Sequence, residues 1–242
     1  MTRLYLVRHG QAGTRDNYDS LSDLGHEQSR LLGEYFVAQG LVFSAAITGA
    51  NFRQQQTATD VRNAYWNAGL NFPELKIDSE WNEFDLDGIF RELAPPLCKD
   101  DPQFQRDFND LREQIRASRG IHAAEIHRRW TPCDMKVMQA WIRARYPYSG
   151  ESWENFRARI AGRRAAIQDG QHAANIVVFT SATPTAIWAG LSLNLDVEHI
   201  MGLAGVLQNG SFSIFRLRSE ELRLFSFNEA PHLSTPELRS HR

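Results

Sequence analysis

The chain has 242 residues, 42% of them hydrophobic and 23% charged, which is the composition of an ordinary globular protein. Its net charge of -2 gives the whole chain no electrostatic reason to bind nucleic acid or a membrane surface. Two cysteines, Cys98 and Cys133, are too few for a disulfide framework and lack the spacing of metal ligands, so we expect reduced thiols.

The first part of the chain predicts strands that alternate with helices. RLYLVRHG (3–10) reads as a buried strand that runs into a polar loop. Apolar residues recur at helical spacing between 21 and 39. VFSAAIT (42–48) then predicts a second strand, NFRQQQTATDVRNAYW (51–66) a second helix, and the short apolar run at 75–77 a third strand.

The stretch 89–146 predicts a helical insertion. Three prolines punctuate its start: Pro95, Pro96 and Pro102. After them, apolar residues between Phe104 and Ile115 fall at spacings of four, three and four, which is one face of an amphipathic helix. A further helix is expected at 134–145, and no strand pattern interrupts the stretch.

The alternation resumes with a helix at 153–168, a strand at 175–181 and a helix at 184–193. Two last strands, 211–217 and 222–227, predict a β-hairpin, and the polar tail after Pro231 is expected to fray. The pattern favours an α/β three-layer sandwich, with a mostly parallel central sheet and helices on both faces. We expect one domain over 1–242, with the insertion at about 89–146.

Polar residues follow four of the predicted strands. In sheets of this kind, ligands bind outside the carboxyl ends of the strands. That rule selects 8–10, 48–53, the segment after Ile77, and 180–184, all of which contain polar groups suited to an anion.

Five short motifs occur in order along the chain: LYLVRHG, SLSDLGHEQ, ITGANFRQQQTA, WNEFD and GESWENFRARI. Together they resemble the histidine phosphatase superfamily, also called phosphoglycerate-mutase-like. Its pattern L-[ST]-x-x-G-x-x-Q is matched by Leu21, Ser22, Gly25 and Gln28, and its second arginine before a Thr-Ala pair by Arg53, Thr57 and Ala58. The matches run from residue 4 to about 190, and five in this order are far more specific than any one alone.

The resemblance implies roles for four catalytic residues. His9 would be the nucleophile, Arg8 and Arg53 would hold the phosphoryl oxygens, and Glu83 would protonate the leaving group and then activate water. The chemistry suits these residue types, because neutral imidazole is a good nucleophile near pH 7 and guanidinium groups match phosphate geometry. Gly10, Ser22, Thr180 and Ser181 are expected to complete the phosphate site.

Other interpretations of these residues remain open. A histidine after a strand is more often a satisfied loop residue, and Glu83 has close rivals in Glu80, Asp85 and Asp87. The segment from Asp85 to Gly88 also resembles an acidic phosphotransfer or metal loop, although no continuous strand precedes it.

The sequence departs from the family at its second histidine, which normally follows the last central strand. Here the strand continues as IVVFTSATPT, with Ser181 at the position of the histidine, or Thr180 if the match shifts by one. Thr183 suits a helix N-cap and Pro184 a first helical position, so hydroxyls and amides could bind an anion there. His199 is a distant candidate to fill the gap.

The sequence therefore predicts a metal-independent phosphomonoester hydrolase that works through a phosphohistidine on His9, without a cofactor. Its substrate would be a small phosphorylated metabolite or a phosphoprotein. The alternatives are a phosphoglycerate-type mutase and a phosphate-binding regulatory protein with impaired catalysis. We expect a cytoplasmic protein, because no signal-peptide pattern precedes the first apolar run and no stretch is apolar enough to span a bilayer.

Overall fold

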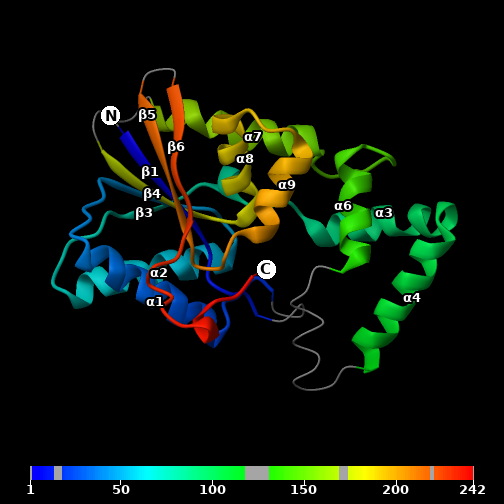
Figure 1. Cartoon of the computed structure of the whole chain (residues 1–242), viewed down its shortest axis with the longest axis horizontal. Helices are drawn as coiled ribbons and strands as arrows, with labels where there is room; N and C mark the ends of the chain where they lie inside the picture. The colour runs from blue at the N-terminus through cyan, green and yellow to red at the C-terminus, as the bar shows by residue number, and fades with distance from the viewer. Residues whose placement is uncertain (1, 14–17, 118–130, 169–173, 219–220, 242) are drawn as a thin grey trace. The chain divides into compact units, whose positions relative to one another are not determined.

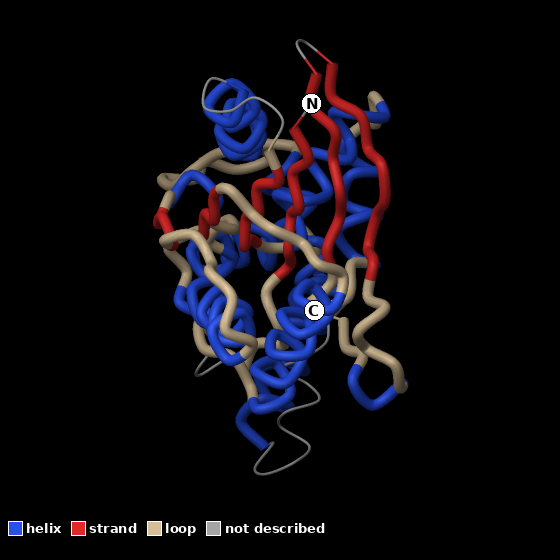
Figure 2. The backbone as a smooth tube through the Cα atoms, turned by 90° about the vertical axis from the view of Figure 1, so that its left-hand side faces the viewer, coloured by secondary structure: helices blue, strands red, loops and turns tan. Residues whose placement is uncertain are grey.

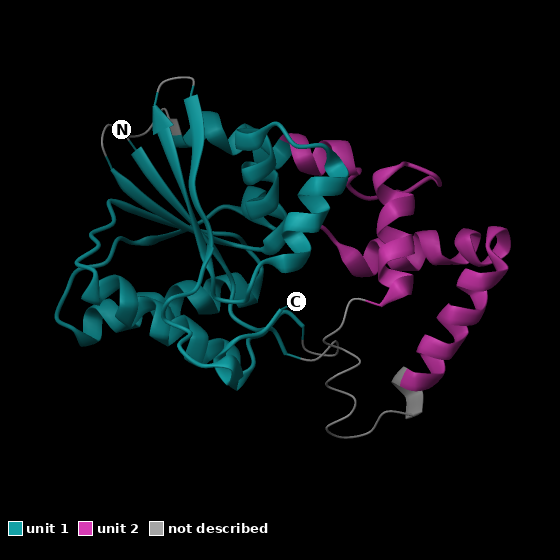
Figure 3. Cartoon of the chain, viewed as in Figure 1, with its two compact units in different colours: residues 1–83, 159–242 teal, residues 84–158 magenta. Residues whose placement is uncertain are grey.

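The computed structural model describes residues 2–13, 18–117, 131–168, 174–218 and 221–241. The chain divides into two compact units, shown in Figure 3. Unit 1 comprises residues 1–83 and 159–242, and unit 2 comprises 84–158. The second boundary falls within helix α7 (Trp153–Gln168).

Unit 1 is built on a six-stranded sheet in the order β3-β2-β4-β1-β5-β6. The strands of this sheet are red in Figure 2. The strands are β1 (Thr2–Arg8), β2 (Ala45–Thr48), β3 (Leu75–Ile77), β4 (Asn175–Thr180), β5 (Phe212–Arg218) and β6 (Glu221–Glu229). The first four in the sheet order pair in parallel, whereas β5 pairs antiparallel with both β1 and β6. The predicted mostly parallel sheet and the C-terminal hairpin are confirmed.

Helices cover both faces of this sheet, as the fold class predicted (Figure 1). Successive side chains of β1 point to opposite faces, so Tyr5 and Leu6 enter different cores. Tyr5 packs edge-on against Phe36 of α1 (Asp23–Ala38), in a core that α2 (Phe52–Asn67) also covers. On the other face Trp188 of α8 (Ala182–Leu193) packs edge-on against Phe215, with ring centroids 5.7 Å apart.

Unit 2 consists of helices around an aromatic core. It contains α3 (Leu86–Asp100), α4 (Pro102–Ala117), α6 (Pro132–Ile142) and the first residues of α7. The rings of Phe84, Trp141, Trp153 and Phe156 pack together. The predicted insertion at 89–146 lies within this unit, and its bounds stay a prediction. Cys98 and Cys133, also in this unit, are free.

The prolines Pro95 and Pro96 do not mark the start of the helical region, as expected, but lie inside α3. A proline inside a helix removes a backbone donor and crowds the preceding turn. The apolar face of α3 nevertheless continues through them, because Ile89, Leu93 and Leu97 are all buried. Packing therefore outweighs local propensity here.

Two further predictions of local structure were wrong, and one helix was missed. Helix α8 begins after Ser181, two residues earlier than expected, so Thr183 is a helical residue and not the cap. Helix α9 (Val197–Val206) was not predicted.

The tail after Pro231 was expected to fray and does not. It contains a short 3-10 turn (Pro236–Leu238), and the Leu233 side chain is fully buried. The Gln28 amide donates to the carbonyl of Leu238 at 2.7 Å, so the tail is tied to α1. Among the described residues, no helix combines the length and the apolar character that crossing a membrane requires.

Candidate active site

Three segments of unit 1 meet where the parallel strands end. The His9 amide donates to the Thr180 carbonyl at 2.9 Å, and the Gly49 amide to the Phe179 carbonyl at 3.1 Å. Because Arg8 pairs with Thr180, the next residues, His9 and Ser181, leave neighbouring strands at the same point. The sheet thus brings together the ends of β1, β2 and β4, as the rule for open α/β sheets predicts.

His9 is buried, with 2% of its surface exposed. Its Nδ1 lies 2.7 Å from the Gly10 carbonyl oxygen, and since that oxygen only accepts, Nδ1 carries the ring proton. Nε2 is then an acceptor, and the Arg53 Nε–H donates to it at 3.2 Å. Burial, followed by the charges of Arg53 and Arg8, holds the pKa of His9 well below its usual value. The imidazole is therefore neutral near pH 7, with its Nε2 lone pair directed at a guanidinium group.

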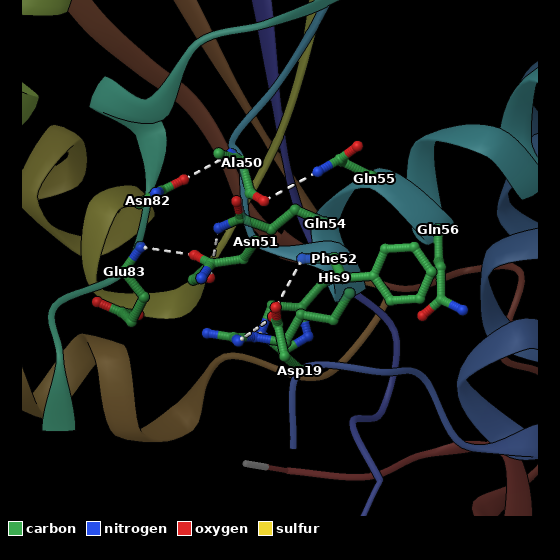
Figure 4. Close-up of polar contacts among 12 residues, drawn as sticks. His9, Asp19, Ala50, Asn51, Phe52, Gln54, Gln55, Gln56, Asn82 and Glu83 are labelled. Carbon is green, nitrogen blue, oxygen red and sulfur yellow. Dashed lines mark hydrogen bonds and ion pairs between the residues drawn. The ribbon is translucent and has the colours of Figure 1, made fainter. Parts of the chain in front are cut away.

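Arg53 lies in the first turn of α2 and is 6% exposed. Its Nη1 forms an ion pair with the Asp19 carboxylate at 2.8 Å, and the Tyr18 ring lies 4.9 Å from the guanidinium carbon. Asp19 also accepts the Phe52 backbone N–H at 3.1 Å, as Figure 4 shows. The Asp19 carboxylate thus lies at a position where the Arg53 guanidinium group and the N-terminus of α2 both favour an anion.

Arg8 is buried beside His9, and its Nη1 donates to the backbone carbonyl of Leu207. Since Arg8 lowers the pKa of His9, its charge acts on the imidazole.

Glu83 follows a 3-10 turn (Ser79–Trp81) beyond β3. Its Oε2 accepts the Thr183 backbone N–H in the first turn of α8, at 3.1 Å. Its own backbone N–H donates to the Asn51 side chain at 3.3 Å (Figure 4). Glu83 therefore joins the start of α8 to the start of α2, where Arg53 lies.

Gly10 and Ser22 support the loop that carries His9. The Gly10 N–H donates to the Thr57 hydroxyl at 3.0 Å, and a Cβ on Gly10 would lie 2.3 Å from the Gly25 carbonyl oxygen, so no larger residue fits. Ser22 caps α1 by accepting the Gly25 N–H at 3.1 Å, and its hydroxyl donates to the Gln11 side chain.

Thr180 and Ser181 hold different partners. The Thr180 hydroxyl donates to the Trp81 carbonyl at 2.6 Å. Ser181, 1% exposed, is the N-cap residue of α8, and its Oγ accepts the Gln54 amide N–H at 2.8 Å. Ser181 stands at the position matched to the second histidine of the family. Because Gln54 follows Arg53 directly in α2, this hydrogen bond connects that position to α2.

Sequence reasoning did not identify four polar residues of this site: Asp19, Asn51, Gln54 and Asn82. Asn82 lies within the WNEFD motif and Gln54 beside Arg53, so their proximity to assigned residues was the available signal. Asp19 carried no such signal.

Two alternative residues have other partners. His199 is exposed on α9, where its Nδ1 lies 2.7 Å from Asp196. Asp85 caps α3 by accepting the Gly88 N–H at 2.9 Å. Within the described ranges, no group of three or more His, Cys, Asp or Glu side chains could hold a metal ion.

Many solved structures are similar to this one. An alpha-ribazole phosphatase from Shigella flexneri aligns with a TM-score of 0.58 at 17% identity, over 94% of this chain and 96% of that one. A phosphoserine phosphatase mutant from Entamoeba histolytica, in complex with phosphoserine, gives 0.58 at 17% identity over 96% and 100%. A phosphoglycerate mutase from Bacillus anthracis gives 0.57 at 18% identity over 96% and 94%. Among curated protein sequences, none is significantly similar to this chain.

The family model for the histidine phosphatase superfamily (branch 1) matches residues 4–140 and, in a second overlapping match, 110–230. Together these matches span most of the chain. They confirm the family predicted from the five motifs, and with it the enzyme class of histidine-type phosphatase. This chain belongs to the histidine phosphatase superfamily.

Proposed function

We propose that this protein is a metal-independent phosphomonoester hydrolase that transfers the phosphoryl group of its substrate to His9 Nε2 and then to water. The observation that carries the proposal is the state of His9, whose Nδ1–H is bound to the Gly10 carbonyl and whose Nε2 faces Arg53. The fixed tautomer places the lone pair on Nε2, and the lowered pKa of His9 keeps that lone pair unprotonated near neutral pH.

In the first step, Nε2 attacks phosphorus, the N–P bond forms and the ester P–O bond breaks. Glu83 gives its proton to the leaving oxygen, so the alcohol departs neutral. Arg53 must turn its Nε–H from His9 to the phosphoryl oxygens, and those oxygens replace Asp19 at Nη1. The planar guanidinium stabilises charge spread over these oxygens.

In the second step, water attacks the phosphoryl group, the N–P bond breaks and Glu83 takes the proton of the water. Imidazole carries a positive charge while it is phosphorylated. The Nδ1–H bond to the Gly10 carbonyl stabilises that charge, because hydrogen bonds from a charged donor are about twice as strong as neutral ones.

Ser181 supplies a weaker donor than the histidine of the family. Its oxygen accepts from Gln54, which leaves the hydroxyl proton to donate to the phosphoryl group. Loss of one strong donor typically lowers turnover about 10²–10³-fold. We therefore expect slow hydrolysis with phosphate binding retained. Full loss of turnover would instead support the regulatory alternative, and no described contact specifically favours the mutase.

A small phosphomonoester is the substrate class we propose. Two of the similar structures are an alpha-ribazole phosphatase and a phosphoserine phosphatase, which supports this class but does not select a member of it.

The test is substitution of the nucleophile. His9→Ala should abolish both hydrolysis of small phosphomonoesters and the acid-labile phosphate that mass spectrometry detects on the quenched wild-type protein. His199→Ala is the matched control, since that histidine is exposed on α9. Turnover by His9→Ala at the wild-type rate would refute the proposal.

A further inference from the structure

Two asparagines form a reciprocal contact between the loop that leads into α2 and the segment that carries Glu83. The Asn82 Oδ1 accepts the Ala50 backbone N–H at 2.6 Å, and the Asn51 Oδ1 accepts the Glu83 backbone N–H at 3.3 Å (Figure 4). Each loop thus supplies one side-chain acceptor and one backbone donor to the other.

Asn51 occupies the N-cap position of α2, yet its side chain does not cap the helix. Asparagine is among the best N-cap residues, because its side-chain oxygen usually accepts an amide of the first turn. Here that oxygen is directed to Glu83 instead. The helix forgoes a stabilising cap, and the contact with Glu83 is what the side chain makes in its place.

The loop before α2 approaches Asn82 closely at Gly49. A Cβ on Gly49 would lie 2.9 Å from the Asn82 Oδ1 and 1.9 Å from the Gln54 Oε1. A side chain at this position would therefore displace one of the two amides. The close approach of this loop to Asn82 depends on glycine.

Arg159 of α7 holds the same segment from its other end. Its Nη1 donates to the Glu80 carbonyl at 2.6 Å and lies 3.4 Å from the carbonyl oxygens of Ser79 and Asn82. The turn before Glu83 is thus fixed by Arg159, and its exit is fixed by the two asparagines.

From these contacts we propose that Asn82 and Asn51 are positioning residues that set the distance between the Glu83 carboxyl group and the phosphate held at the start of α2. The inference rests on the proposed function of Glu83 as general acid. A general acid acts only within hydrogen-bond reach of the leaving oxygen, so a small displacement weakens proton transfer. Arg53 and Asn51 lie in the same turn, so the pair fixes the acid relative to the phosphate ligand itself.

The dependence of the rate on the leaving group tests this inference. An alkyl phosphate such as phosphoserine needs a proton on its leaving oxygen, whereas p-nitrophenyl phosphate releases a stable phenolate and needs little help. In Asn82→Ala we expect kcat/KM for the alkyl phosphate, which reports phosphoryl transfer to His9 and not the later hydrolysis, to fall about tenfold, the rate equivalent of one lost hydrogen bond. The kcat/KM for p-nitrophenyl phosphate should change less than about twofold.

Gln55→Ala is the matched control, because the Gln55 amide donates to the carbonyl of the same Ala50 from the α2 side of the contact. It should leave the ratio of the two rates unchanged, while Glu83→Gln should give the largest change in that ratio. Asn51→Ala is the second variant, for use if Asn82→Ala does not fold. The ratio is measured on one sample, so partial misfolding does not alter it.

Equal losses on both substrates, or no loss on either, would overturn the positioning role while leaving the phosphatase proposal intact. If the wild-type protein hydrolyses neither substrate and forms no phosphohistidine, the proposed function itself is wrong, and the inference fails with it.

Discussion

At the scale of single residues, the state of one imidazole decides what the site can do. His9 is buried, and both burial and the charges of Arg53 and Arg8 disfavour its protonated form. Histidine is the residue whose charge changes most readily near neutral pH, so its environment determines whether it is a nucleophile or a cation. Here the Gly10 carbonyl selects the tautomer that leaves Nε2 unprotonated.

Asp19 should compete with phosphate for Arg53. Its carboxylate is paired with Arg53 Nη1 and is 56% exposed, so an entering anion can displace it. We expect Asp19→Asn to tighten the binding of inorganic phosphate by up to about fivefold, since an ion pair whose carboxylate is exposed to solvent contributes about 1 kcal/mol. Calorimetric titration with phosphate measures this change.

Asp23→Asn is the control for the lost charge, because Asp23 is an exposed acid in the first turn of α1. It should have little effect on phosphate affinity. Weaker phosphate binding by Asp19→Asn would show the opposite role, in which Asp19 orients Arg53 for the substrate.

At the scale of elements, the site depends on how strand ends approach helix starts. The loop after β1 packs so closely on α1 that a Cβ on Gly25 would lie 2.1 Å from the Gln11 carbonyl oxygen. Helix periodicity revealed α1 and α2, but the close approach between loop and helix was visible only as a glycine in a motif.

Substitution by alanine should therefore change the free energy of unfolding in opposite directions at Gly25 and Gly162. Gly25→Ala introduces an atom where backbone already lies, and we expect it to lower the free energy of unfolding by about 1–3 kcal/mol. Gly162 lies within α7, and a Cβ there would meet nothing within 4 Å. Gly162→Ala should raise stability by about 0.5–1 kcal/mol through helix propensity. Urea unfolding measures both, and similar effects of the two substitutions would contradict the packing argument.

At the scale of the whole molecule, the C-terminal tail is part of unit 1. His232 packs against Tyr35 of α1, with ring centroids 6.2 Å apart. Burial lowers the pKa of His232 to about 4. The tail is therefore held by apolar and neutral contacts that protonation would oppose.

Acid should weaken the fold through His232. In the unfolded chain His232 has a pKa of about 6.5, so below that pH the unfolded state binds a proton that the native state does not bind. The free energy of unfolding therefore falls as the pH decreases toward about 4, the pKa of His232 in the native state. Between pH 7 and pH 5 this linkage is about 2 kcal/mol. His232→Gln should lose correspondingly less stability over that interval in urea unfolding. Equal losses in wild type and variant would show that His232 titrates normally in the native state.

The sequence by itself determined the family, the fold class and the candidate nucleophile. Hydrophobic periodicity reports which face of each element is buried, and the motifs lie at strand ends, where open α/β sheets bind ligands. Both signals are local in the sequence, so they can be recognised without knowledge of the tertiary structure. They also explain why α1, α2 and the central strands were predicted well.

Only the tertiary structure decided which polar groups face one another. The Asp19–Arg53 pair spans 34 residues, and the Gln54–Ser181 contact spans 127, so no local pattern encodes them. The same is true of the tail, whose polar composition suggested fraying. The contact that holds it joins Leu238 to Gln28, 210 residues away in the chain, so no local pattern shows it. Hydrogen bonds depend on distance and direction, and folding alone sets both for residues so far apart in sequence.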